Sequence, residues 1–175
     1  MPINSLNELL KVNNGNNMKL AVVVAQDAEV LEAVSEAREL KIAEPILIGD
    51  EEKIKTIIAD RELDLEDVEI INEKDYEKCA EIGVKSVNNG KANFIMKGLV
   101  DTSILLKEVL NKDYGLRTNS LLSHVMVYEA PSYHKLIYLT DGGMNLVPNL
   151  KEKIKIINNA VKVCKAFGKE EIKVG

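Results

Sequence analysis

The sequence has few residues of the kinds that build disulfide frameworks or zinc sites. It contains two cysteines, Cys79 and Cys164, and two histidines, His124 and His134, among 175 residues. Each cysteine lies in a segment with the apolar spacing of an amphipathic helix, and the four residues show no paired spacing typical of a zinc site. We therefore interpret the cysteines as buried, reduced thiols and predict no metal centre.

Clusters of positive charge and long apolar runs are also absent. The 23 basic and 28 acidic side chains are spread along the chain, with a net charge of -5, whereas a nucleic-acid surface needs clustered positive charge. The longest apolar runs, such as 20–25, are far too short for a membrane span, and residues 1–10 do not have the pattern of a signal peptide. We expect no nucleic-acid partner, no membrane partner and a cytoplasmic location.

The common signatures of nucleotide-binding and hydrolase sites are missing too. The chain contains no Gly-x-x-x-x-Gly-Lys, no Gly-x-Gly-x-x-Gly and no Gly-x-Ser-x-Gly. A phosphate-bearing ligand is still compatible with this acidic chain, because a few backbone N–H groups and one or two basic side chains can hold an anion.

What the sequence does contain is an alternation of short apolar runs and amphipathic segments. The runs are rich in β-branched residues and predict buried strands at 19–25, 44–49, 68–71 and 94–98. Helical spacing predicts helices within 1–12 and at 27–40, 50–59, 75–88 and 101–110, the first of them ended by the polar run 13–17. Asp27 and Asp50 are expected to cap the helices that they begin. Strands separated by such helices pair in parallel through right-handed crossovers.

The pattern changes after residue 120. Strands are predicted at 123–128 and 135–140, and the connection between them is too short for a crossover helix, so we expect them to be antiparallel neighbours. A helix follows from about 150 to 167, and 171–175 is expected to open another strand. Domains commonly run about 100 to 200 residues, so the length fits one domain or one piece of a larger fold. The prediction is an α/β fold: a three-layer α/β/α lobe with a mixed, mostly parallel sheet.

The first candidate ligand loop follows the fourth predicted strand. Ligands of open α/β sheets collect beyond the carboxyl ends of strands. Gly98 permits an unusual backbone angle or close approach of a ligand, and Thr102 and Ser103 lie at a helix start whose N–H groups can face an anion. Lys97 and Lys107 could add positive charge. The alternative is an ordinary capped loop with solvated lysines.

The second candidate loop follows the sixth predicted strand. The adjacent glycines Gly142 and Gly143 would let the backbone pass close to a ligand, and Asp141 and Asn145 offer polar groups to orient one. The alternative is a plain turn into the last helix.

Several segments occur in a fixed order along the chain: 96–110, Gly-Leu-Arg at 115–117, Leu-Ser-His-Val at 122–125, and Leu-Thr-Asp-Gly-Gly-Met-Asn-Leu-Val-Pro-Asn at 139–149. Together they resemble the phosphate acetyl/butyryltransferase family, closest to its butyryl-transferring members. The resemblance covers nearly the whole chain in layout and is most specific from residue 94 to about 168. It assigns Thr102, Ser103 and Lys107 to a segment that approaches the substrate cleft and 141–145 to a second cleft loop.

The resemblance implies acyl transfer between a coenzyme A thioester, carrying butyryl or a similar short chain, and inorganic phosphate. The products would be acyl phosphate and coenzyme A, and no separate cofactor is implied. The family fold is a pair of α/β lobes similar to isocitrate and isopropylmalate dehydrogenases. Residues 1–175 would be its N-terminal portion, truncated before a second half that carries the serine, arginine and aspartate credited with catalysis. No catalytic role is therefore assigned, and we expect the chain alone to be inactive.

Two other function classes stay open. One is a stand-alone small-molecule binding module, and the other is a relative of the dehydrogenases that share the fold, which would need carboxylate-rich metal ligands and an adenine-nucleotide pocket. The antiparallel pair within 123–140 could present an edge for a homodimer.

Overall fold

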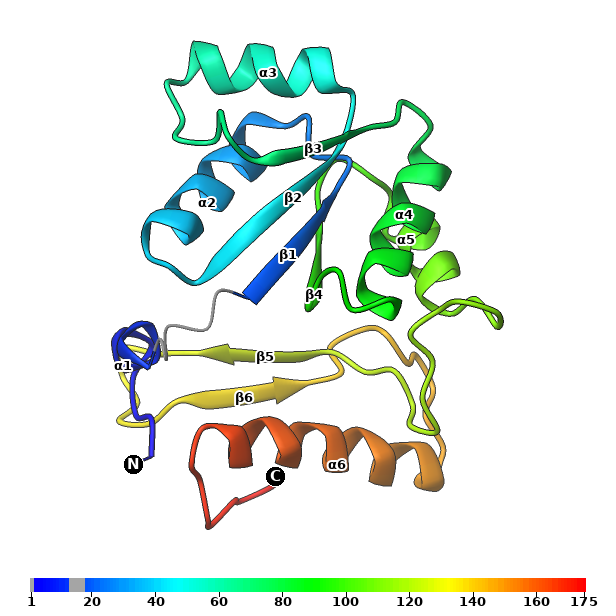
Figure 1. Ribbon diagram of the computed structural model, residues 1–175. Helices are drawn as coiled ribbons and strands as arrows, with labels where there is room; N and C mark the ends of the chain where they lie inside the picture. The colour runs from blue at the N-terminus through cyan, green and yellow to red at the C-terminus, as the bar shows by residue number, and fades with distance from the viewer. Residues whose placement is uncertain (1, 13–17) are drawn as a thin grey trace. The chain divides into compact units, whose positions relative to one another are not determined.

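The computed structural model describes residues 2–12 and 18–175, which divide into two compact units (Figure 1). One unit is formed by residues 13–117, and the other combines residues 1–12 with 118–175. The predicted domain over residues 1–175 therefore contains two units, and each is described by itself. The predicted polar run at 13–17 lies outside the described residues.

The unit of residues 13–117 is built on a parallel sheet. Its strands pair in the order β3-β2-β1-β4, and every neighbouring pair is parallel. This topology confirms the predicted parallel pairing of strands that are joined by helices. The strand bounds are β1 Met18–Val23, β2 Ala43–Gly49, β3 Glu69–Asn72 and β4 Phe94–Lys97.

Helices cover both faces of this sheet, so the unit is a three-layer α/β/α structure (Figure 1). Alternate residues of β1 separate the two cores: Val22 packs with the residues of α2 and α3, and Val23 with those of α4. Each fully buried apolar side chain contributes about 1.5 to 3 kcal/mol. The helix bounds are α2 Ala28–Glu39, α3 Glu51–Asp60, α4 Tyr76–Asn88 and α5 Thr102–Val109.

Aspartate caps set the starts of three of these helices. The side chains of Asp27, Asp50 and Asp75 accept hydrogen bonds from backbone N–H groups in the first turns of α2, α3 and α4. Such a cap is worth about 1 kcal/mol. The caps of α2 and α3 were predicted from the sequence.

The second unit contains α1 Leu6–Lys11, β5 Val125–Tyr128, β6 Ile137–Thr140 and α6 Leu150–Ala166. β5 and β6 are antiparallel, as predicted, with Val127 opposite Tyr138. The helix α6 begins at a capping box in which Asn149 and Glu152 bond each other's backbone.

Two predictions about strands are wrong. β5 and β6 form a two-stranded sheet of their own and do not join the parallel strands in one mixed sheet. Their short connection determines that they pair with each other, but it carries no information about a further neighbour. Residues 171–175 form no strand, because this segment has no strand pairing in the part of the chain that the structure describes.

The cysteines agree with the interpretation made from the sequence. Cys79 and Cys164 are both buried free thiols. Burial, with smaller contributions from Glu73 and Asp75, raises the pKa of Cys79 to about 11.

Within residues 2–12 and 18–175, no helix combines the length and the apolar character that a membrane crossing requires.

Candidate functional site

The parallel sheet has a topological switch point between β1 and β4. From β1 the chain crosses to β2 and β3 on one side, then returns from β3 to pair β4 with the other side of β1. The loops after β1 and β4 therefore run in different directions at the carboxyl edge of the sheet, which is where ligands bind in this architecture. The first candidate loop lies at this point.

Gly98 holds the two loops together at the switch point. Its N–H donates to Val23 O at 2.8 Å, and the N–H of Leu99 donates to Val24 O at 2.9 Å. A Cβ at position 98 would lie 2.3 Å from Val24 O, closer than any side chain tolerates. The close approach that this glycine permits is therefore to neighbouring backbone, and it involves no unusual positive φ at Gly98 itself.

The end of β1 is strained at the same place. Val24 is buried and has a φ of 56°, a left-handed conformation that is a true outlier for a β-branched residue. Such strain costs about 1 to 3 kcal/mol and clusters at ligand sites and switch regions. No pattern in the sequence signals it, because valine is the usual residue of an ordinary strand.

The side chain of Lys97 hydrogen-bonds to the backbone of its own loop. Its Nζ donates to Gly98 O at 3.2 Å and to Val100 O at 2.9 Å. These bonds fix the path of the chain from β4 into α5. The ammonium group is therefore part of the loop's own structure, and its charge lies beside the start of the helix.

The start of α5 is open. Asp101 occupies the N-cap position with extended backbone, but its side chain makes no capping hydrogen bond. Thr102 and Ser103 are exposed, and their hydroxyl and N–H groups have no hydrogen-bond partner among residues 2–12 and 18–175. These donors lie at the positive end of the helix dipole, where an anion is stabilised by about 0.3 to 1 kcal/mol or more.

Lys107 lies near this helix start in sequence but has a partner of its own. Its Nζ is 3.1 Å from Glu77 Oε2 on α4, and this hydrogen bond and the charge of Glu77 raise the pKa of Lys107. Both side chains are about two-thirds exposed, so the pair is weak and can be exchanged for another anion. Sequence reasoning missed Glu77, although packing of α4 and α5 on one face of the sheet could have suggested it.

The second candidate loop is closed by its own polar groups. Asp141, at a φ of 52°, accepts hydrogen bonds from the N–H of His124 at 3.1 Å, and from the N–H and Nδ2 of Asn145 at 3.0 and 2.7 Å. Partial burial opposes ionisation, but these hydrogen bonds outweigh it and lower the pKa of Asp141. Asn145 Nδ2 also donates to Leu122 O at 3.1 Å, so both side chains are engaged in the turn.

Gly142 and Gly143 form the open part of this loop. Both are exposed, and a Cβ at either position would have no neighbour within 4 Å. A side chain at either position would therefore meet open space, and a ligand contact at this loop stays a prediction. The predicted residues thus fall into two sets, 97–107 in one unit and 141–145 in the other.

The comparisons with known proteins match this chain to one protein family. Residues 4–82 and 78–175 match the family described as phosphate acetyl/butaryl transferase. The phosphate butyryltransferase of Clostridium acetobutylicum is 47% identical over 173 residues, which are 98% of this chain and 58% of the relative, and that of Clostridium beijerinckii is 49% identical over 86% of this chain and 50% of its own length. The chain thus spans about half the length of these relatives.

A solved structure shows the same relationship. A branched-chain phosphotransacylase from Enterococcus faecalis superposes with a TM-score of 0.70 at 26% identity, over 87% of this chain and 52% of that one. The family match spans nearly the entire sequence and includes both candidate loops. The chain belongs to the phosphate acetyl/butaryl transferase family.

Proposed function

We propose that this chain takes part in short-chain acyl transfer between a coenzyme A thioester and inorganic phosphate, giving acyl phosphate and coenzyme A. The observation that carries the proposal is the open start of α5, where Thr102 and Ser103 offer unpaired donors at the switch point of a family member. The names of the relatives in both Clostridium species support butyryl as the acyl group.

The donors at α5 suit a phosphate group of the substrates. Attack of phosphate on a thioester, or of a thiol on an acyl phosphate, builds a tetrahedral oxyanion beside several negative charges, so donors must be preorganised around it. A base must also accept the proton of the thiol. The donors at this helix start support a binding role for Thr102 and Ser103.

Other parts of the proposal follow from the family. The substrates would lie in a cleft of a two-lobed fold like that of isocitrate and isopropylmalate dehydrogenases, with Asp141–Asn145 as a second cleft loop. The free edges of the β5–β6 pair would serve a homodimer, and the enzyme would act in the cytoplasm without a further cofactor. The names of the relatives favour a transferase over the dehydrogenase alternative for this chain.

Measurements of activity and of binding together test whether this chain binds the substrate without turning it over at an ordinary rate. Release of coenzyme A thiol from butyryl-coenzyme A and phosphate should be far below the roughly 1 to 1000 per second of ordinary enzymes. Saturable binding of butyryl-coenzyme A should nevertheless be measurable by calorimetry. Turnover at an ordinary rate would show that the chain holds the catalytic groups, and absence of binding would contradict the proposal.

Three substitutions locate the contact. Thr102→Val removes a hydroxyl at nearly constant volume and should weaken binding by about 1 to 3 kcal/mol, the scale of a hydrogen bond to a charged group. Lys107→Met should also weaken binding. Glu77→Gln should strengthen it, because Lys107 loses its competing partner. The matched control is Thr56→Val, whose hydroxyl donates to Glu52 O on α3 at 2.8 Å, and it should leave the affinity unchanged.

A further inference from the structure

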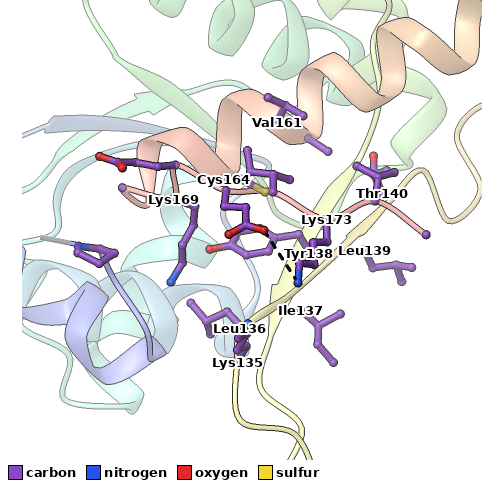
Figure 2. A pocket seen from close by; sticks show the side chains of 18 of the residues that line it. Lys135, Leu136, Ile137, Tyr138, Leu139, Thr140, Val161, Cys164, Lys169 and Lys173 are labelled. Carbon is purple, nitrogen blue, oxygen red and sulfur yellow. Dashed lines mark ion pairs between the residues drawn. The ribbon is translucent and has the colours of Figure 1, made fainter.

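His124 belongs to the Leu-Ser-His-Val segment, and the proposed function gives it no role. It directly precedes β5, and Asp141 directly follows β6, so the two residues lie opposite each other at the end of the antiparallel pair. The N–H of Asp141 donates to His124 O at 3.0 Å, and the N–H of His124 donates to Asp141 Oδ1 at 3.1 Å. Thr140, labelled in Figure 2, donates from Oγ1 to His124 O at 2.9 Å. Three hydrogen bonds thus fix the backbone of His124 beside the second candidate loop.

The residues before His124 are held by one side chain of α6. Asn159 donates from Nδ2 to Leu121 O and to Ser123 Oγ, both at 2.8 Å. Its Oδ1 accepts from Ser120 Oγ at 3.1 Å. The path of the chain into His124 is therefore determined by α6 as well as by the loop after β6.

The imidazole of His124 has no comparable contacts. It is exposed, and it makes no hydrogen bond, ion pair or ring contact with residues 2–12 and 18–175. The other histidine differs, because the ring of His134 lies against that of Tyr133, with 5.0 Å between the centroids. His124 thus combines a fixed backbone with a side chain that is available to a ligand.

Asp141 determines the charge around this imidazole. Burial opposes the ionisation of Asp141, but hydrogen bonds from Asn145 and from the His124 N–H outweigh burial, and the charge of His124 also lowers the pKa of Asp141. The carboxylate is therefore negative at neutral pH, and the imidazole lies close enough to interact with it. A phosphate group at this place would be repelled by the carboxylate, so the ligand group that meets His124 should be uncharged.

The loop after Asp141 leaves space on this side of the imidazole. A Cβ at Gly142 or Gly143 would have no neighbour within 4 Å among the described residues. Asp141 itself is held at a φ of 52°, a strained conformation of the kind that clusters at ligand sites. The space, the strain and the free imidazole therefore occur together at one end of the β5–β6 pair.

The chemistry of an imidazole indicates which substrate group it would meet. A neutral imidazole accepts one hydrogen bond and donates another, and it exchanges a proton near neutral pH. In the proposed reaction the thiol of coenzyme A is the uncharged group that gives up a proton. Positive charge that develops on His124 would lie beside the negative charge of Asp141, which is favourable.

We propose that His124 contacts the reacting end of the coenzyme A substrate, accepting a hydrogen bond from the thiol of coenzyme A and donating one to the carbonyl oxygen of the thioester. This inference rests on the proposed function and adds the residue beside the second candidate loop that meets the sulfur-bearing end. The residues that carry it all belong to the unit that contains α6.

The two histidines of the chain make a direct test possible. Nuclear magnetic resonance of the ¹⁵N-labelled chain should show two imidazole spin systems, which His124→Ala and His134→Ala assign. Coenzyme A and butyryl-coenzyme A should shift the His124 ring signals saturably and leave those of His134 in place. Desulfo-coenzyme A, in which hydrogen replaces the thiol group, should bind without shifting the His124 ring signals to the same extent.

Calorimetry with the same ligands gives an independent measurement. His124→Ala should weaken coenzyme A about three- to tenfold, the scale of one hydrogen bond, and leave desulfo-coenzyme A unchanged. The matched control His134→Ala should change neither affinity.

The outcomes separate this inference from the proposed function. Saturable binding of coenzyme A with the His124 ring signals in place, or an equal effect of His124→Ala on both ligands, overturns the role of His124 and leaves the proposed function standing. Failure of butyryl-coenzyme A to bind the chain at all overturns both.

Discussion

Substitution of Gly98 by alanine tests whether backbone packing fixes the switch point. The added Cβ would meet three backbone atoms, Val24 O at 2.3 Å, Val23 O at 2.8 Å and Val24 C at 3.0 Å. None of these can rotate away as a side chain does, and the N–H of Gly98 is already bonded to Val23 O at 2.8 Å. The clash can be relieved only by moving β4 away from β1.

The expected cost is set by two opposing effects. Overpacking in a rigid site costs about 1 to 3 kcal/mol and occasionally more. The alanine also restricts the unfolded chain, which returns about 0.4 to 1 kcal/mol. Since all the contacted atoms are backbone, we expect a net loss near the upper end, about 2 kcal/mol or more.

The assay should report on the unit that contains Gly98. In a Cys164→Ala background the remaining thiol is Cys79, which is fully buried in that unit. Its reactivity with a thiol reagent across a urea series then gives the midpoint of unfolding of this unit. Gly142→Ala is the matched control, since a Cβ there meets nothing within 4 Å, and its effect should stay within about 0.5 kcal/mol. Equal midpoints for Gly98→Ala and its parent would refute the packing argument.

Three further predictions concern charge, reactivity and the core. Two hydrogen bonds from Arg38, each 2.8 Å, lower the pKa of Asp67, so its contribution to stability is present above the ordinary value of 3.8 and is lost as the pH falls below it. When the free energy of unfolding is measured at decreasing pH, Asp67→Asn should therefore lose less stability than the unsubstituted chain. An identical decrease in the two proteins would contradict this linkage. Cys79, with a pKa of about 11, should react with iodoacetamide much more slowly than a free thiol at pH 7.5, and a rate equal to that of free cysteine would exclude its burial. Leu47→Ala should cost about 2 to 5 kcal/mol in urea unfolding because Leu47 is fully buried, whereas a cost below about 0.5 kcal/mol would remove it from the core.

Local signals predicted most of the parallel unit. Short β-branched runs and the caps Asp27 and Asp50 identified the strands and helices to within a few residues, because these features act within one turn or one strand. The separate β5–β6 sheet was not predictable in the same way, since a hairpin determines its own pairing and no other.

The candidate site was predicted in part for the same reason. Thr102 and Ser103 follow from a strand running into a helix, and the structure leaves both exposed at an open helix start. The partner of Lys107 could not be deduced from spacing, because Glu77 is 30 residues away and meets it only through the packing of two helices. The left-handed Val24 has no sequence signal at all.

The central claim is that the start of α5 contacts a phosphate-bearing substrate. It is tested most directly by titrating butyryl-coenzyme A into the ¹⁵N-labelled chain and following the backbone amides by nuclear magnetic resonance. The account predicts saturable shifts of the Thr102 and Ser103 amides, reduced in Thr102→Val and enhanced at the same ligand concentration in Glu77→Gln. Saturable binding that shifts other amides and leaves those of Thr102 and Ser103 in place would contradict it.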